Sequence, residues 1–194
     1  MIEDDNFAEA FDGLQLSTQK FSSMEFEECT FSHCDFSHVL FKKCHFFECH
    51  FMHCDMSLMQ VMDSRFSGCK FEDCKLIGVD WTKADWSALT QVAPKFKRCV
   101  LNDSSFWGLK LESIMIHACD AKDVDFREAN LHAADCAHSD FSRALFRKST
   151  LTKVDFSDAR GFDIDVRVNE IKGAKFSRYE AVRLLGGLDI VLVD

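Results

Sequence analysis

Apolar side chains recur at every fifth position of this chain, from Phe11 to Phe156, and the phase never slips by a residue. The stretch contains 30 such positions, and 27 of them hold Phe, Leu, Trp, Met, Val or Ile, with Phe at sixteen. A helix repeats its apolar face about every 3.6 residues and a half-buried strand every second residue, so neither produces this pattern. The five-residue period predicts an all-β solenoid, in which short segments stack their apolar residues into one continuous core.

The position two residues before the apolar position most often holds a small residue, and nine of the ten cysteines stand there. Disulfide frameworks and metal sites place cysteines by pairing geometry and not by a single repeat phase. We therefore expect small core residues with free thiols, and histidines that face outward and cannot join them around a zinc ion. The cysteines in this phase are Cys29, Cys34, Cys44, Cys49, Cys54, Cys69, Cys74, Cys99 and Cys119, whereas Cys136 takes an apolar position itself.

Four five-residue segments should close one coil, so residues 20 apart should stack at the spacing of neighbouring strands, about 4.8 Å. This predicts columns of side chains, among them Phe26, Phe46 and Phe66, and Phe31, Phe51 and Phe71. One interruption is predicted at residues 87–95, where the loop residues are Thr90, Gln91, Pro94 and Lys95. The five-residue phase is kept on both sides, and we expect a loop displaced from the coil, which is either functional or a tolerated defect.

The end of the chain predicts a cap for the solenoid. Ser177 to Glu180 reads as a capping box, Ala181 to Leu185 as one short helix, and Gly186-Gly187 as its stop. Leu188 to Val193 is apolar and β-branched, which predicts a final strand. The chain thus divides into an N-terminal cap at residues 1–10, a repeat region at 11–160, and a last partial coil with helix and strand at 161–194. The helix either closes a monomer or joins two subunits.

The segments FEECTFSHCDF (26–36), FFECHFMHCDM (46–56) and SGCKFEDCKL (67–76) resemble the repeats of pentapeptide-repeat proteins, and the resemblance covers residues 11 to about 176. It implies a right-handed quadrilateral β-helix. More narrowly, residues 75–86, 99–109 and 176–194 resemble the members that confer albicidin resistance, microcin immunity or quinolone resistance by protecting DNA gyrase. That resemblance implies a DNA-mimicking homodimer joined through its C-terminal ends, with contacts at Tyr179, Val182, Leu185, Leu188, Ile190 and Leu192.

The formal net charge of −9 has the sign that a DNA mimic needs. Its density is less than half that of duplex DNA, which carries about 21 charges over the roughly 36 Å of axis that the repeats would span. Charge must therefore act together with shape. The face predicted to contact a partner carries Asp80, Asp103, Asp120, Asp123 and Asp140. An aspartate just before an apolar position can instead hydrogen-bond the backbone of its own turn, and that alternative stays open.

Several classes of function find no support in the sequence. It has no glycine-rich phosphate loop, nucleophile elbow or paired buried carboxylates, so we expect neither an enzyme nor a cofactor. The net charge disfavours direct binding of nucleic acid, and no apolar run is long enough to cross a membrane. The acidic first twelve residues are unlike a signal peptide, which predicts a cytoplasmic protein. The alternative to a gyrase-binding role is a rigid scaffold that binds a different protein.

Overall fold

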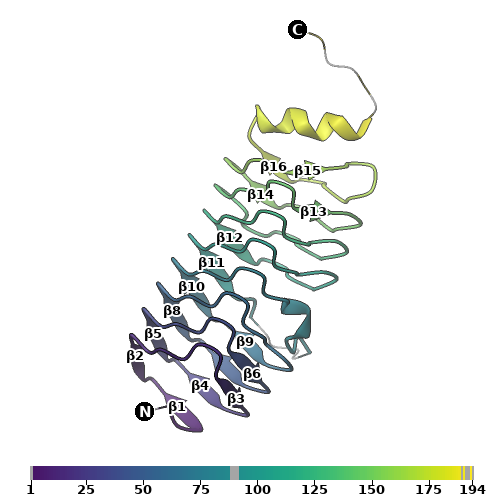
Figure 1. Ribbon diagram of the computed structural model, residues 1–194. Helices are drawn as coiled ribbons and strands as arrows, with labels where there is room; N and C mark the ends of the chain where they lie inside the picture. The colour runs from purple at the N-terminus through teal and green to yellow at the C-terminus, as the bar shows by residue number, and fades with distance from the viewer. Residues whose placement is uncertain (1, 88–91, 189, 191–192, 194) are drawn as a thin grey trace.

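The computed structural model describes residues 2–87, 92–188, 190 and 193. The chain winds into a rod of stacked parallel coils, with the N-terminus at one end and a helix across the other (Figure 1). This is the right-handed quadrilateral β-helix that the sequence predicted. The strands in the first half are β1 (Asp5–Phe7), β2 (Ala10–Asp12), β3 (Lys20–Ser22), β4 (Glu25–Glu27), β5 (Thr30–Ser32), β6 (Leu40–Lys42), β7 (His45–Phe47), β8 (His50–Met52), β9 (Arg65–Ser67) and β10 (Lys70–Glu72). The remaining elements are η1 (Trp81–Lys83), β11 (Lys95–Lys97), β12 (Met115–His117), β13 (Leu145–Phe146), β14 (Asp155–Phe156), β15 (Asp163–Ile164), β16 (Lys175–Phe176) and η2 (Glu180–Leu188).

Each strand is at most three residues long and turns a single side chain toward the core. In β5, Phe31 is buried while Thr30 and Ser32 point outward, because successive residues of a strand face opposite sides. Phe31 pairs in parallel with Phe51, and Phe51 pairs with Phe71. A shift by one residue would expose every one of these rings, so the apolar residue fixes the register of its coil.

The four faces of the rod follow one another along the chain. The first face carries the sheet β2-β5-β8-β10-β11-β12 and, further on, the pair β14-β16. The second face is a line of single bridges that begins between Gln15 and Asp35 and ends between Asp140 and Arg160. The third face holds the pairs β3-β6 and β13-β15, and the fourth holds β1-β4-β7-β9.

The chain turns most corners through a residue with positive φ, two positions after the apolar residue. Within the described residues, 24 non-glycine side chains adopt this left-handed conformation, for example His33 with φ 53°. The conformation costs an L-residue about 1–2 kcal/mol. Stacking compensates for that cost, because each corner N–H bonds the next coil, as the His33 N–H does to the carbonyl of Met52 at 3.0 Å.

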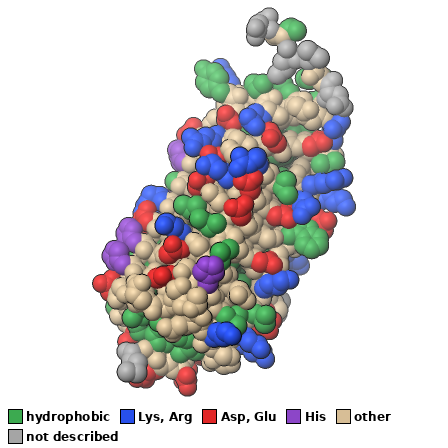
Figure 2. Space-filling view, in the orientation of Figure 1, with side chains coloured by type: hydrophobic (Ala, Val, Ile, Leu, Met, Phe, Trp, Pro, Cys, Tyr) green, Lys and Arg blue, Asp and Glu red, His purple; other side chains and the backbone are tan. Residues whose placement is uncertain are grey.

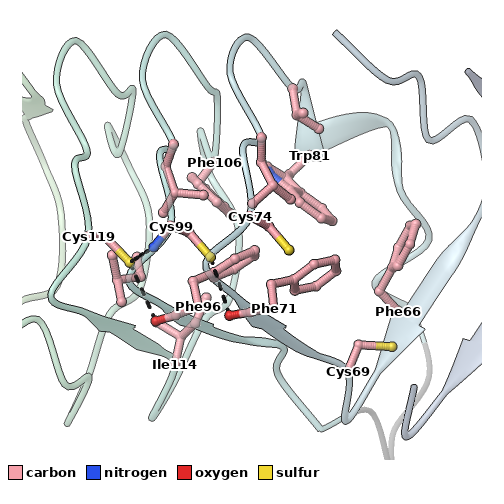
Figure 3. Packing of buried hydrophobic residues seen from close by; sticks show 14 of the residues in the cluster. Phe66, Cys69, Phe71, Cys74, Trp81, Phe96, Cys99, Phe106, Ile114 and Cys119 are labelled. Carbon is pink, nitrogen blue, oxygen red and sulfur yellow. Dashed lines mark hydrogen bonds between the residues drawn. The ribbon is translucent and has the colours of Figure 1, made fainter. Parts of the chain in front are cut away.

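Aromatic rings form the predicted columns inside the rod. Phe26, Phe46 and Phe66 stack with centroid separations of 4.8 and 4.7 Å, and Phe31, Phe51 and Phe71 stack at 4.9 Å each. Adjacent columns meet edge to face, an arrangement that aromatic quadrupoles favour. Figure 3 shows Phe66, Phe71, Phe96 and Phe106 filling the space between the walls.

All ten cysteines are buried with free thiols. Eight of the thiols donate to a carbonyl of the preceding coil, as Cys49 Sγ does to the Phe26 oxygen at 3.3 Å. Figure 3 shows Cys74, Cys99 and Cys119 aligned along the core. Burial raises the pKa of the Cys44 and Cys136 thiols, which keeps them neutral and inert. Among the described residues, no cluster of histidine, cysteine and acidic side chains could hold a metal ion.

The coils begin earlier than the predicted boundary at residue 10. Strand β1 already pairs with β4, 20 residues along the chain. Asn6 stands at the core position of this first coil, where its side-chain amide donates to the carbonyls of Glu3 (2.7 Å) and Glu25 (3.2 Å). A buried amide is stable there because its hydrogen bonds are satisfied.

The prediction that residues 20 apart stack in every coil is wrong after Phe71. Phe71 pairs with Phe96, and their rings stack at 5.1 Å, so this coil contains 25 residues instead of 20. The five additional residues lie in the sequence between Asp85, whose N–H still bonds the Ser64 carbonyl at 2.8 Å, and Val92, which bonds Ser67 and Gly68. An insertion of five residues preserves the apolar phase, which is why the sequence period conceals it.

The C-terminal segment forms the predicted short helix, η2, but without the predicted signals at its ends. The Ser177 hydroxyl accepts from the Asp158 N–H (2.7 Å), and the Glu180 carboxylate accepts from the Gly161 N–H (3.1 Å). Both side chains therefore bind the last coil and do not form a capping box. The two glycines at 186 and 187 lie within η2 and do not stop it. The predicted strand at 188–193 falls largely outside the described residues.

Asp155 links the last two coils and gives a pH-dependent prediction. Hydrogen bonds from Lys175 (2.8 Å) and Ser157 (2.9 Å) hold the pKa of Asp155 at about 2, below its ordinary 3.8. A lowered folded-state pKa contributes stability above the unfolded pKa and loses it as the pH falls through the folded value. Asp155→Asn should therefore destabilise the protein by about 1 kcal/mol at pH 7, and the difference should shrink between pH 4 and pH 2. Urea titrations measure both, with Asp4→Asn as the control, and a gap of constant size would contradict the assignment.

Candidate protein-binding surfaces

Four of the five predicted contact aspartates come together, and we call this group the acidic corner: Asp103, Asp120, Asp123 and Asp140. Asp120 and Asp140 are bridge partners on adjacent coils of the second face. Asp103 and Asp123 lie at the corner that follows, and the Asp103 N–H bonds the carbonyl next to Asp123, that of Lys122, at 3.0 Å.

Asp80 does not belong to this group, which corrects the predicted face. It pairs with Ser105, which in turn pairs with Asp125, so it lies on the third face. There its carboxylate caps η1 by accepting from the N–H (3.1 Å) and the hydroxyl (2.5 Å) of Thr82. The cause is the 25-residue coil, which moves every earlier residue one face away from the place that counting in twenties gives it.

The acidic corner is largely neutralised by cations on neighbouring coils. Lys122 lies 3.0 Å from Asp120 and 3.7 Å from Asp140. Arg143 forms a two-pronged pair with Asp123, and Arg160 reaches Asp140 at 3.1 Å. Figure 2 shows acidic and basic side chains intermixed over much of the visible face. With three cations beside four carboxylates, this corner offers a basic partner little net attraction.

Asp140 is the most buried carboxylate of the acidic corner. Burial acts to raise its pKa, but hydrogen bonds from the hydroxyl (2.6 Å) and N–H (3.0 Å) of Ser142, together with Arg160, outweigh burial and lower it. Its geometry is that of a turn-stabilising residue, which confirms the alternative left open by the sequence. Equivalent bonds to the backbone two residues on are made by Asp35, Asp55, Asp80, Asp85, Asp125, Asp135 and Asp155.

A second acidic surface, which the sequence reasoning missed, lies at the N-terminal end of the rod. We call it the acidic end, and its carboxylates are exposed. Asp12 lies near His33 and Glu25 near His45, but no lysine or arginine of the described residues pairs with any of them. The sequence feature that could have revealed this surface is the charge distribution, because residues 1–40 contain nine acidic residues and only one lysine or arginine, Lys20. The members are Glu3, Asp4, Asp5, Glu9, Asp12, Glu25, Glu27 and Glu28.

The predicted loop is shorter than residues 87–95. Pro94 is buried in the wall, and Lys95 is the first residue of β11, where it lines a shallow hollow with Lys70 and Met115. The other two predicted loop residues, Thr90 and Gln91, lie outside the described residues.

Apolar side chains gather at the C-terminal end, where the sequence predicted a subunit contact. Tyr179 is 90% exposed, and Val182, Leu188 and Ile190 are exposed as well. Leu185 is half-buried, and Leu192 lies outside the described residues. Within the described part of the chain, no helix reaches the length and hydropathy needed to cross a bilayer.

Comparison with known proteins agrees with this geometry. A family model described as "Pentapeptide repeat region" matches residues 24–93, and "Pentapeptide repeats (8 copies)" matches residues 117–160. No curated protein matches the chain.

Among solved structures, a trypsin-treated variant of QnrB1, described as a plasmid-mediated fluoroquinolone resistance protein, is 20% identical, with a TM-score of 0.73 over 97% of this chain and 99% of that one. Full-length QnrB1 is 19% identical, with a TM-score of 0.58 over 96% and 100%. HetL from the cyanobacterium Nostoc sp. strain PCC 7120, involved in heterocyst differentiation regulation, is 14% identical, with a TM-score of 0.50 over 88% and 84%. At these identities the likeness concerns the fold. With the five-residue period, the four-faced coil and the family matches together, the chain belongs to the pentapeptide-repeat family.

Proposed function

We propose that this protein binds DNA gyrase in the cytoplasm and protects the enzyme from a poison such as albicidin or a quinolone, acting by binding and not by catalysis. The observation that carries the proposal is the rod itself, which follows a QnrB1 structure over 97% of its own length and 99% of the other chain. QnrB1 is a fluoroquinolone resistance protein, and a rod of this form can occupy a groove built for duplex DNA.

The distribution of charge supports a basic partner. The surface of a DNA-binding enzyme that faces phosphates carries lysine and arginine, and unpaired carboxylates steer a protein toward such a surface. Among the described residues, eight of the carboxylates without a lysine or arginine partner lie together at the acidic end and the others are scattered along the rod, whereas the acidic corner has three cations for its four carboxylates. We therefore assign the main electrostatic contact to the acidic end.

Supercoiling by purified gyrase tests the proposal. In a reaction poisoned by albicidin or a fluoroquinolone, the protein should restore supercoiled product as its concentration rises. The variant Asp4→Asn/Asp5→Asn/Glu9→Gln/Glu25→Gln should need about tenfold more protein for the same rescue, because it lacks the long-range attraction.

The matched control neutralises two carboxylates of the acidic corner, Asp103→Asn/Asp123→Asn, and should rescue like the wild type. A stronger loss in this control than in the acidic-end variant would assign the contact to the corner instead. If the wild-type protein neither rescues nor inhibits at micromolar concentration, gyrase is not its target.

We further propose that two copies join through their C-terminal ends. The exposed apolar residues of η2 and the segment after it would be buried in such a dimer, which removes the open end of the solenoid. Val182→Asp places a charge in that contact and should convert a dimer into a monomer. Sedimentation equilibrium measures the mass, with Val168→Asp, an exposed valine outside η2, as the control. A wild-type protein that stays monomeric at tens of micromolar would refute the dimer.

A rigid scaffold with a partner other than gyrase is the second candidate. HetL, whose described role is in differentiation regulation, shares the fold with a TM-score of 0.50. The near-neutral acidic corner also favours this reading, because it weakens the imitation of DNA on that part of the rod. The gyrase experiment separates the two functions, since a scaffold for another protein leaves supercoiling unchanged.

A further inference from the structure

The corner between the third and fourth faces carries a surface of opposite character, which we call the basic edge: Trp107, Arg127, Arg147 and Lys148. Trp107, Arg127 and Arg147 occupy the same register position on three consecutive coils. The backbone confirms the stacking, because the Gly108 N–H bonds the Arg127 carbonyl and the Glu128 N–H bonds the Arg147 carbonyl, each at 2.9 Å. The side chains are therefore spaced along the rod at about 4.8 Å per coil.

These side chains line an open hollow of about 410 Å³ together with Glu128. Trp107 differs from the other two tryptophans in its exposure. Trp81 is fully buried in the core, and Trp86 donates its indole N–H to the Trp81 carbonyl at 2.8 Å, whereas Trp107 is 54% exposed. An indole exposed to solvent does not contribute the large buried apolar area that an aromatic side chain gives in the core. Figure 2 shows basic side chains along the margin of the rod on the side where Figure 1 places β13.

Two of the three cations of the basic edge, Arg147 and Lys148, are available to a ligand. Arg127 is held by Asp125 through two hydrogen bonds of 2.9 and 2.7 Å, which fixes the direction of its guanidinium. The side chains of Arg147 and Lys148 form no hydrogen bond or ion pair with the part of the chain that the structure describes. A partner would thus meet one oriented cation and two unpaired ones around an exposed ring.

We propose that the basic edge binds an acidic helical segment of a partner protein. Exposed tryptophan beside arginine is the composition of energetically dominant contacts between proteins. Carboxylates four residues apart on a helix are about 5–6 Å apart, close to the spacing of Arg127 and Arg147. An apolar residue on the same helix face would then cover Trp107. Arginine is suited to such carboxylates because it forms two parallel hydrogen bonds.

Two observations favour a peptide over nucleic acid. Glu128 lines the hollow, where a continuous phosphate backbone would meet its negative charge. The whole chain carries a net charge of −9, which repels a polyanion more strongly than a short acidic segment. This proposal does not depend on gyrase, because it concerns a different corner and a partner of the opposite charge.

Fluorescence anisotropy tests the proposal with a labelled 16-residue helical peptide that carries glutamates at four-residue spacing and one phenylalanine. The peptide should bind saturably at low salt, and Arg147→Glu/Lys148→Glu should weaken binding at least about tenfold. Trp107→Ala should weaken it about fivefold or more. The matched control is Lys42→Glu/Lys43→Glu, which changes the same register positions on the same corner near the other end of the rod and should bind within about twofold of wild type.

A second readout uses the tryptophans themselves. Because Trp81 is buried and Trp86 is only partly exposed, whereas Trp107 is 54% exposed, quenching by acrylamide reports most strongly on Trp107, and the bound peptide should reduce the quenching. A single-stranded dT16 oligonucleotide serves as the competing ligand. The proposal is overturned if the peptide does not bind saturably, if dT16 binds more tightly with the same dependence on Arg147 and Lys148, or if the control variant loses binding equally.

Discussion

Replacing Phe51 with alanine lowers the free energy of unfolding by about 3–5 kcal/mol. Phe51 is fully buried, stacks between Phe31 and Phe71 at 4.9 Å on either side, and meets Phe46 edge to face at 5.7 Å. Removal of its ring leaves a cavity that the neighbouring coils cannot fill, since the backbone hydrogen bonds between coils fix their separation. Urea titration followed by circular dichroism measures the change.

Phe47→Ala supplies the matched control, because this ring lies four residues away and is 45% exposed. Its loss should cost less than about 1 kcal/mol. Equal costs at the two positions would mean that the columns of rings do not stabilise the rod.

Gly161→Ala is expected to destabilise the last coil by about 2–4 kcal/mol. Gly161 has a φ of 74°, and an added Cβ would lie 2.9 Å from both the Cα and the N of Ser142, backbone atoms that cannot move away. Gly13→Ala separates the cost of the positive φ from the cost of the steric clash, because Gly13 has a similar φ of 66° but open space around it. The free energy of unfolding of that variant should fall by only about 1 kcal/mol. A smaller effect at Gly161 than at Gly13 would show that the coils can move apart locally.

The core was predictable because one rule governs it at every repeat. A single inward side chain per strand fixes the identity of Phe31, Phe51 and Phe71 as neighbours, and the same rule places the cysteines inside. No tertiary information beyond the 20-residue coil is needed. The rule holds wherever the coil has its ordinary length.

The candidate site was harder, since a surface depends on which coils lie side by side. Asp80 was placed with Asp120 because the interval between them is a multiple of 20, but the longer coil moves it to the third face. The pairs of Asp123 with Arg143 and of Asp140 with Arg160 also join neighbouring coils, so the net charge of the corner emerges only from the stacked structure. The acidic end could have been predicted without knowing which coils are neighbours, because its carboxylates lie close together in the sequence.

The helix ends could not be predicted from local signals either. Ser177 and Glu180 have the spacing of a capping box, but the last coil offers the N–H groups of Asp158 and Gly161 as competing partners. The hydrogen bonds that Ser177 and Glu180 accept from the last coil hold η2 against the open end of the solenoid, and they also stabilise the first turn of the helix. Arg183 adds to the docking by donating to the Phe162 carbonyl at 3.0 Å.

The 25-residue coil separates two kinds of positional information that the rest of the rod keeps together. Whether a residue points inward depends on its number modulo five, whereas the wall on which it lies depends on its number modulo twenty. Adding one pentapeptide to a coil leaves the inward or outward direction unchanged and moves the later residues to the next wall, a quarter turn around the rod. Such an event can therefore move a whole block of surface residues to the adjacent wall at little cost to the core, and a binding surface can be reassigned without a single substitution.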